Sequence, residues 1–212
     1  MKRQILCALV FLCFSANSIA ESLESFRERK ITPRAAWGAK AAKPDMTLNP
    51  EKRIIAIHHT AGVANSDRAT VKNIQSYHMD TRGWSDIGYH FLVAPNGTIY
   101  EGRELQYQGA HVYGHNAGSI GLNFLGCFDS VECHAPQYPA VASVTDAMIR
   151  SMGQLVGVLC AHYGIDMNEQ NIKGHRQFAG AQTACPGDRI LERLPEIRSI
   201  AQDVVKGKHE EL

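Results

Sequence analysis

The run RIIAIHH, residues 53–59, constrains the fold more than any other segment, because it is the β-branched apolar pattern of a buried strand. A buried strand needs other strands beside it and further elements packed on its faces. The run ends in two histidines, and adjacent residues on a strand point to opposite faces of the sheet. We therefore expect His58 and His59 to face different surroundings, with only one of them in any given site.

Three other segments have strand patterns. IGYHFLVAPNGTIYEG, residues 87–102, predicts two strands joined by a turn at Pro95-Asn96-Gly97. SIGLNFLG, residues 119–126, predicts another strand, and NIKG, residues 171–174, a short one. Because one hairpin is clear, we expect a mixed sheet.

Helices are expected between these strands. The first covers residues 69–79 after the cap signal Ser66-Asp67, the second is long and starts near Ser143, and the third covers 188–204. The interleaving predicts a single-domain α/β fold, with a central, mostly mixed sheet flanked by about three helices.

The first twenty residues have the pattern of an export signal. Lys2 and Arg3 precede the apolar run ILCALVFLCF, and small residues stand just before Glu21. The run is shorter than the roughly 20 residues that a membrane span needs, although a retained anchor is the alternative. We expect a signal peptide over 1–20, no stable membrane insertion, and a periplasmic or secreted product.

The remaining chain has the size of one domain. Removing 20 of 212 residues leaves 192, and losing Lys2 and Arg3 leaves 20 basic against 21 acidic side chains. This balance, without a basic cluster, argues against nucleic acid as a partner, and we expect a monomer. Charges and prolines predict an irregular lead-in over 21–50, the domain over 51–204, and a flexible tail over 205–212.

Three side chains with metal-binding chemistry follow strand ends or precede a helix. His58 ends the first strand, His175 follows NIKG, and Cys185 lies at the start of the last helix. Two imidazoles and one thiolate at one sheet edge make three ligands for a single zinc ion and leave a fourth position for water, as in catalytic zinc sites. From these residues alone, core histidines and an ordinary buried cysteine remain the alternative.

Four blocks of sequence, in order, resemble a known family. IIAIHHTAG, GWSDIGYHFLVAPNGTIYEGR, GAHVYGHNAGSIGLNFLG and GHRQFAGAQTACPGD are similar to the signature blocks of the peptidoglycan recognition proteins and the amidase-type phage lysozymes. That family comprises zinc N-acetylmuramoyl-L-alanine amidases and inactive receptors on the same fold. The blocks span residues 54–188, which is most of the chain.

The resemblance implies roles for individual residues. His58, His175 and Cys185 match the zinc ligands, and Tyr89 matches the catalytic tyrosine. The phage enzymes have a lysine at the position of Thr183. The catalytically active recognition proteins have a threonine there, as this chain does. The interval from His175 to Cys185 is ten residues, where about eight is expected from the resemblance, so AGAQ should form a bulge. Groove residues that contact the substrate are matched by Thr60, Trp84, His111 and Asn116.

The implied reaction is hydrolysis of the amide between the lactyl group of N-acetylmuramic acid and the L-alanine of the stem peptide, so peptidoglycan or muropeptides are the expected partner. Two alternatives stay open: a recognition protein that binds peptidoglycan without cutting it, and a cysteine hydrolase with Cys185 as nucleophile and His175 as base. Gly83-Trp84 resembles members that prefer diaminopimelate-type peptides, although Ala117 replaces the arginine that often accompanies that preference.

The other cysteines and histidines are expected to be structural. Cys127 and Cys133 are spaced to close a small disulfide loop in an oxidising compartment, with two free thiols as the alternative. Cys160 is expected to be buried in the long helix. Among the histidines, His59 is expected to be structural and His90 to face away from Tyr89. The further histidines expected to be solvated or structural are His78, His115, His134 and His162. The resemblance also favours a bacterial source, because the disulfide beside the first helix of many animal members is absent.

Overall fold

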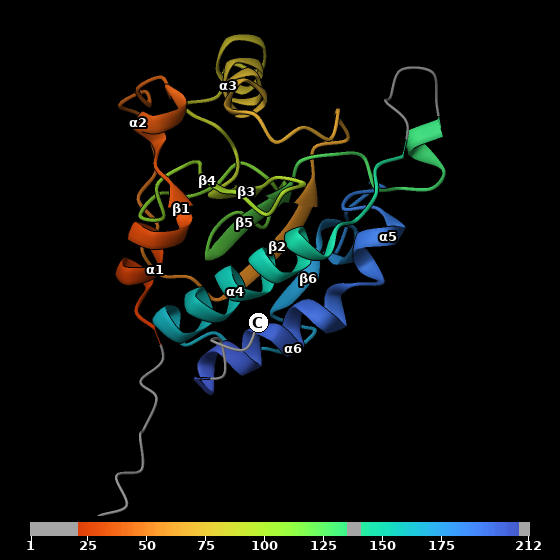
Figure 1. Cartoon of the computed structure of the whole chain (residues 1–212). Helices are drawn as coiled ribbons and strands as arrows, with labels where there is room; N and C mark the ends of the chain where they lie inside the picture. The colour runs from red at the N-terminus through yellow and green to blue at the C-terminus, as the bar shows by residue number, and fades with distance from the viewer. Residues whose placement is uncertain (1–20, 135–140, 208–212) are drawn as a thin grey trace, which may run out of the picture.

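A single six-stranded sheet forms the centre of the computed structural model, which describes residues 21–134 and 141–207 (Figure 1). The strands are β1 (Ile31–Thr32), β2 (Ile54–His59), β3 (Phe91–Val93), β4 (Ile99–Glu101), β5 (Ser119–Phe124) and β6 (Ile172–Gly174). They lie in the order β1-β4-β3-β5-β2-β6, and every neighbouring pair is parallel except the hairpin β3–β4. The predicted mixed sheet is confirmed.

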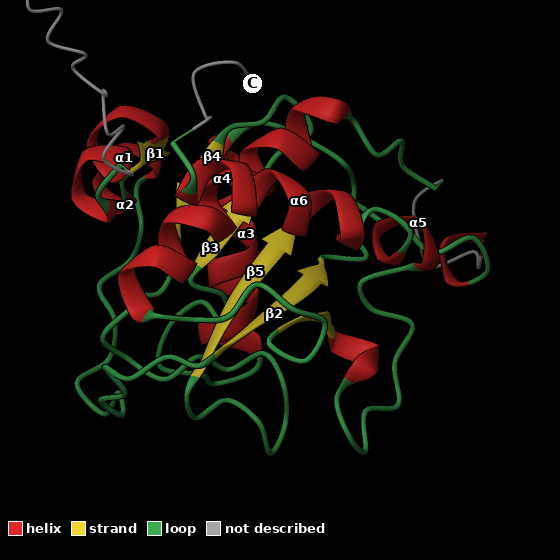
Figure 2. Cartoon of the chain, turned by 90° about the horizontal axis from the view of Figure 1, so that it is seen from below, coloured by secondary structure: helices red, strands yellow, loops and turns green. Residues whose placement is uncertain are grey.

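Helices cover both faces of this sheet. They are α1 (Leu23–Lys30), α2 (Arg34–Trp37), α3 (Arg68–Ser76), α4 (Asp146–Tyr163), α5 (Asp188–Leu191) and α6 (Leu194–Val205). In Figure 1, α3 lies on one side of the strands while α4 and α6 lie together on the other, and Figure 2 shows α4 and α6 in front of β3, β5 and β2. Within the described ranges, no helix is long and apolar enough to cross a membrane.

Side-chain alternation along β2 decides which face carries chemistry. Ile55 and Ile57 pack into the core with α4 and α6, where Met152 and Leu155 are fully buried. Because successive strand residues point to opposite faces, His58 lies on the other face, the face that α3 covers. His59 returns to the α4 side.

The segment before β2 is more ordered than its sequence suggests: residues 23–37 form two helices and a strand, while residues 38–50 have the irregular backbone predicted for the lead-in. Its first helix, α1, is capped by the Ser22 side chain, and Leu23 and Phe26 are buried in the main core. The short strand β1 then pairs with β4, and the Trp37 indole donates to the Glu101 carbonyl. Among the described residues, α1 and β1 therefore pack with the part of the chain that begins at residue 51.

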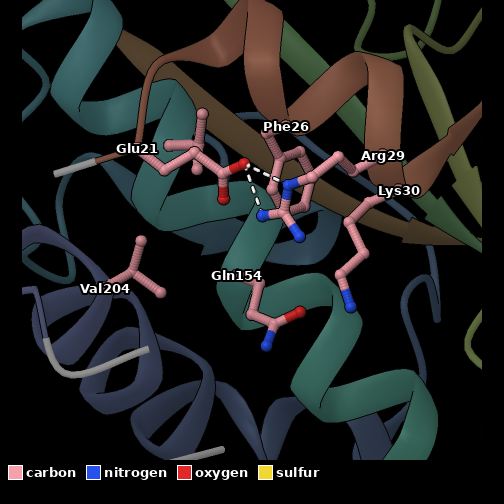
Figure 3. Close-up of a pocket in the computed structure, with 7 residues that line it drawn as sticks. Glu21, Phe26, Arg29, Lys30, Gln154 and Val204 are labelled. Atoms are coloured by element: carbon pink, nitrogen blue, oxygen red, sulfur yellow. Dashed lines mark hydrogen bonds and ion pairs between the residues drawn. The ribbon is translucent and has the colours of Figure 1, made fainter. Parts of the chain in front are cut away.

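A cavity of about 230 Å³ lies between α1, α4 and α6, on the sheet face away from His58 (Figure 3). Phe26 and Lys30 line it from α1, and Gln154 and Val204 line it from α4 and α6. Figure 3 shows the Arg29 guanidinium paired with the Glu21 carboxylate, both of which line the cavity, with Nε to Oε1 at 3.0 Å. This ion pair compensates the negative charge of Glu21, which precedes α1.

Two helix boundaries differ from the sequence prediction. Thr145, not Ser143, caps α4, because its Oγ1 accepts from the Met148 N–H at 3.1 Å. The expected last helix is broken into α5 and α6, since Pro195 lacks the N–H that a continuous helix would use. The C-terminal helix ends at Val205, so the tail prediction falls mostly on 208–212, which lie outside the described residues, as does the proposed signal peptide at 1–20.

Candidate active site

His58, His175 and Cys185 come together at one edge of the sheet. His58 is near the end of β2, His175 follows the neighbouring parallel strand β6, and Cys185 precedes α5. Their donor atoms lie within 4.8 Å of one another. The His58 Nδ1 and the Cys185 Sγ are 3.5 Å apart, close to the roughly 3.6 Å that tetrahedral zinc with ordinary Zn–N and Zn–S bonds imposes. The His58–Cys185 pair is therefore already at the separation that zinc needs, and the full set of donors, within 4.8 Å of one another, would fit the ion after a small inward movement.

The protonation of this cluster also suits a cation. Burial, followed by neighbouring histidines, lowers the pKa of His58 well below its usual value, and burial lowers the pKa of His175. Both imidazoles are therefore neutral at neutral pH, as metal ligands must be. Burial raises the pKa of the Cys185 thiol to about 12, so a thiolate needs a nearby cation. A buried protonated thiol is a poor nucleophile, which disfavours the cysteine hydrolase.

His111 contacts His58 rather than standing free in a groove. The His111 Nδ1 is 3.1 Å from the His58 Nε2, and the His111 side chain is buried. A Cβ on Gly121 would approach the His111 ring to 2.4 Å, so the glycine leaves the space that the imidazole occupies. Metal-binding histidines usually donate their second N–H to such a partner, which fixes the ring orientation. This contact orients the His58 ring, while the expected contact of His111 with a substrate stays a prediction.

Tyr89 and Thr183 flank the cluster in different ways. The Tyr89 ring centroid lies 5.3 Å from that of His58, and the side chain is partly exposed. Burial and the neighbouring Cys185 raise the pKa of Tyr89, so its hydroxyl keeps the proton and can donate a hydrogen bond. The Thr183 Oγ1 accepts from the Cys185 N–H at 3.1 Å, which ties the threonine to the ligand loop.

A groove of about 460 Å³ opens beside the cluster between the sheet and α3. Thr60, Tyr77, His78 and Tyr89 line it together with Val63 and residues of α3. Val63 and Tyr77 are large exposed apolar side chains at this groove. An open, partly apolar groove beside polar side chains suits a long substrate.

The other expected groove residues have structural bonds of their own. Thr60 Oγ1 accepts from the Gly126 N–H at 2.9 Å, and Asn116 Oδ1 accepts from the N–H groups of His111 and Val112. Asn116 and Trp84 line a second hollow of about 250 Å³ rather than the groove beside α3. Of the expected substrate contacts, only Thr60 lines the groove itself.

Two further histidines contact residues of this site. His78 is the buried, structural case of the two that the sequence left open: its ring contacts those of Trp84 and Tyr89, with centroids 4.6 and 5.6 Å away, and its Nδ1 accepts from the Gly88 N–H. His90 accepts from the Gly121 N–H and donates to the Tyr107 carbonyl. With both nitrogens occupied, His90 is structural.

The loop between His175 and Cys185 takes up its extra residues in a turn. The Ala181 N–H donates to the Phe178 carbonyl, Gly180 has φ of +77°, and Phe178 is buried. The two ends stay together because the Arg176 N–H donates to the Cys185 carbonyl at 2.8 Å. The expected bulge therefore leaves the spacing of the ligands intact.

The other cysteines of the described ranges divide as expected. Cys127 and Cys133 form a disulfide, and Cys160 is a buried free thiol in α4. The acidic residues of the disulfide loop and Arg176 were missed by the sequence interpretation. Arg176 stands directly after a candidate ligand, in a block already singled out, and that position was the available signal.

Comparison with known proteins assigns the family. The model of the family described as N-acetylmuramoyl-L-alanine amidase matches residues 48–188, well over half of the chain. The chain belongs to this amidase family. Among its members, peptidoglycan-recognition protein SC2 of Drosophila simulans is 37% identical over 169 residues, covering 77% of this chain and 84% of that protein. The human N-acetylmuramoyl-L-alanine amidase is 31% identical over 85% of this chain, which spans only 30% of that longer protein.

A solved structure of a peptidoglycan recognition protein extends the likeness to three dimensions. The crystal structure of peptidoglycan recognition protein-LE in complex with tracheal cytotoxin, a monomeric diaminopimelic acid-type peptidoglycan, aligns with a TM-score of 0.64 and 31% identity. The alignment covers 78% of this chain and 92% of that one. The α/β architecture is therefore that of the amidase family.

Proposed function

We propose that the protein is a zinc-dependent N-acetylmuramoyl-L-alanine amidase that cuts between the lactyl group of N-acetylmuramic acid and the L-alanine of the stem peptide. The observation that carries the proposal is the cluster of His58, His175 and Cys185, whose donor atoms lie within 4.8 Å of one another. The groove lies beside it, since Tyr89 lines the groove and its ring contacts that of His58. Two neutral imidazoles and a thiol that needs a cation to ionise are the chemistry of a catalytic zinc site.

Each residue at the site then has a defined task. A bound zinc ion supplies a Lewis acid and lowers the pKa of a water molecule to roughly 7. Tyr89 donates its hydroxyl proton in a hydrogen bond to the amide oxygen as negative charge develops there. Thr183 holds the Cys185 backbone N–H and keeps its own hydroxyl proton available for a water or the substrate.

The groove beside α3 supplies the binding surface for peptidoglycan or muropeptides. Tyr77 and Val63 offer exposed apolar surface, while Thr60 and Asn73 offer polar groups. The bound tracheal cytotoxin in the related structure supports this class of ligand. Trp84 stacks on His78, which lines the groove, so the diaminopimelate preference suggested by Gly83-Trp84 would act through that contact. Equal turnover of diaminopimelate and lysine muropeptides would contradict the preference.

The second candidate is a recognition protein without activity, because the family includes proteins named for recognition. Cys185 and Tyr89 favour the enzyme. Inactive receptors of the resembling family usually lose the cysteine, whereas here its sulfur lies 3.5 Å from the His58 Nδ1.

Export to an oxidising compartment belongs to the same proposal. The Cys127–Cys133 disulfide supports it, because such bonds persist outside the reducing cytosol. Cleavage after residue 20, a monomeric state and a bacterial source stay predictions.

Chelation and alkylation separate the candidate functions. Purified protein is incubated with peptidoglycan before and after dialysis against a chelator, after restoring zinc, and after thiol alkylation of the zinc-loaded form. The amidase loses activity on chelation and regains it with zinc. Activity that survives chelation but not alkylation would indicate a thiol hydrolase, and binding without cleavage under every condition would indicate a receptor.

A further inference from the structure

The loop closed by the Cys127–Cys133 disulfide contacts the chain next to each of the three candidate zinc ligands. It follows β5 and runs over residues 127–133 beside the end of β2 and the loop before α5. None of its side chains is among the three donors. Its contacts instead reach the neighbours of His58, His175 and Cys185.

The first contact is with His59, directly after His58. The Phe128 N–H donates to the His59 Nδ1 at 3.2 Å, and the Glu132 Oε2 lies 3.6 Å from the His59 Nε2. The His59 N–H in turn lies 3.4 Å from the Cys185 Sγ. The loop therefore contacts both ring nitrogens of His59, the residue that follows His58 and contacts Cys185.

The second contact is with Arg176, directly after His175. The Asp129 Oδ2 accepts from the Arg176 guanidinium at 2.5 Å, and the Asp129 Oδ1 accepts from the N–H groups of Val131 and Glu132. Although burial alone raises the pKa of Asp129, these hydrogen bonds lower it to about 2, so the carboxylate is charged. One buried side chain thus shapes the loop and ties it to the ligand segment.

The third contact is with the segment after Cys185. The Ser130 N–H donates to the Asp188 Oδ1 at 2.9 Å, and the Ser130 hydroxyl donates to the other oxygen of the same carboxylate. The backbones also meet: a Cβ on Gly187 would lie 2.3 Å from the Phe128 carbonyl. The loop and the ligand segment are packed so closely here that only glycine fits.

We propose that the disulfide loop is a positioning device for the zinc centre, with Asp129 as its central positioning residue. The inference rests on the proposed zinc function. Holding Asp129 toward Arg176, Ser130 toward Asp188 and Phe128 toward His59 fixes the three ligand-bearing segments relative to one another. Phe128 anchors the start of the loop in the main core, whereas Val131 is 81% exposed, so the disulfide supplies the anchor at the far end of the loop. Groups that orient metal ligands typically contribute 10- to 100-fold to metal affinity.

Two variants test the loop, each with a matched control. Asp129→Asn keeps an oxygen for the N–H groups of Val131 and Glu132 but removes the charge that faces Arg176. Its control is Glu101→Gln, another buried carboxylate paired with an arginine, Arg27, but at β4. The disulfide is removed with Cys127→Ser and Cys133→Ser together, and Cys160→Ser, a buried free cysteine, is the control.

Zinc affinity of full-length protein is measured by competition with a chromogenic chelator, and the thermal midpoint of the zinc-free protein is measured alongside. We expect about 10- to 100-fold weaker zinc binding for Asp129→Asn and for the double serine variant, and wild-type affinity for both controls. The absorption spectrum of the cobalt-substituted proteins should change in the loop variants only.

The outcomes separate this inference from the function on which it rests. If the wild type binds zinc and Asp129→Asn binds it equally well, the positioning role is overturned while the amidase proposal stands. If the wild type itself holds no zinc, the amidase proposal fails first. Should the double serine variant not fold, the comparison of Asp129→Asn with Glu101→Gln decides the matter alone.

Discussion

The Nδ1 of His58 lies 3.5 Å from the Sγ of Cys185, and these two side chains come from positions 127 residues apart in the chain. The other nitrogen of the same ring lies 3.1 Å from the Nδ1 of His111. A single orientation of the His58 ring therefore points its Nδ1 toward the Cys185 sulfur and its Nε2 toward His111. The contact with His111 therefore orients the His58 ring independently of a metal ion.

Replacing His111 should weaken zinc binding rather than substrate binding alone. His111→Ala removes the partner of the His58 Nε2, and we expect about 10- to 100-fold lower zinc affinity in a chelator competition. Gly121→Ala should have a similar effect, because its Cβ would displace the His111 ring. Unchanged zinc affinity with a raised KM for muropeptides would return His111 to a purely substrate-contacting role.

Tyr89→Phe should separate catalysis from metal binding. The ring contacts with His58 and His78 are kept, so zinc content should stay at the wild-type level. Loss of the hydroxyl donor should lower kcat by about 10²- to 10³-fold, measured by release of stem peptides. Tyr100→Phe is the control, since that hydroxyl donates to the Ser66 carbonyl at 2.7 Å. Wild-type turnover by Tyr89→Phe would remove the tyrosine from the mechanism.

Lys52 should give the protein a pH-dependent stability in alkaline solution. Burial, followed by repulsion from Arg103, lowers its pKa from 10.5 to about 8. Between these values the unfolded chain holds a proton that the folded chain has lost, so stability rises with pH across this window and is lowest below about pH 8. The interval between 10.5 and about 8 corresponds to at most about 3 kcal/mol of stability.

Lys52→Met tests whether the buried ammonium lowers stability below about pH 8. The Tyr107 carbonyl keeps a donor, because the His90 Nε2 also reaches it at 3.1 Å. In urea titrations, the variant should be more stable than wild type at pH 7, and the difference should shrink toward pH 10. A constant difference across that range would contradict the buried charge.

Phe26 tests whether the N-terminal segment belongs to the folded unit. The side chain is 2% exposed and packs into the core shared by α4 and α6. Phe26→Ala should lower the free energy of unfolding by about 3 to 5 kcal/mol in urea titrations. A loss below about 1 kcal/mol would restore the interpretation of this segment as a loose lead-in.

The sequence predicted the elements whose patterns are local. β2, the hairpin β3–β4 and α3 have apolar periods or turn residues that specify them, and Asp67 caps α3 as expected. α1 was missed because only Leu23 and Phe26 are apolar in a charged run, and the helix depends on distant contacts such as Arg27 with Glu101. Such tertiary support is invisible in a local pattern.

At the site, too, residues could be predicted from sequence motifs, whereas their contacts could not. The resemblance named the three donors, and the structure brings them together. It could not show that Asn116 uses its oxygen on backbone N–H groups, or that His111 faces His58, because these depend on atoms brought together by folding. Asp129 was missed for the same reason: its partner Arg176 is 47 residues away.

The most direct test of the central claim is mass spectrometry of muropeptides after incubation with the purified protein, with its zinc content measured in parallel. The account predicts free stem peptides that begin with L-alanine, produced by the zinc-loaded wild type and absent with His58→Ala and Cys185→Ala, which should also lack zinc. Intact muropeptides with fully zinc-loaded wild type, or equal cleavage by metal-free protein, would contradict it.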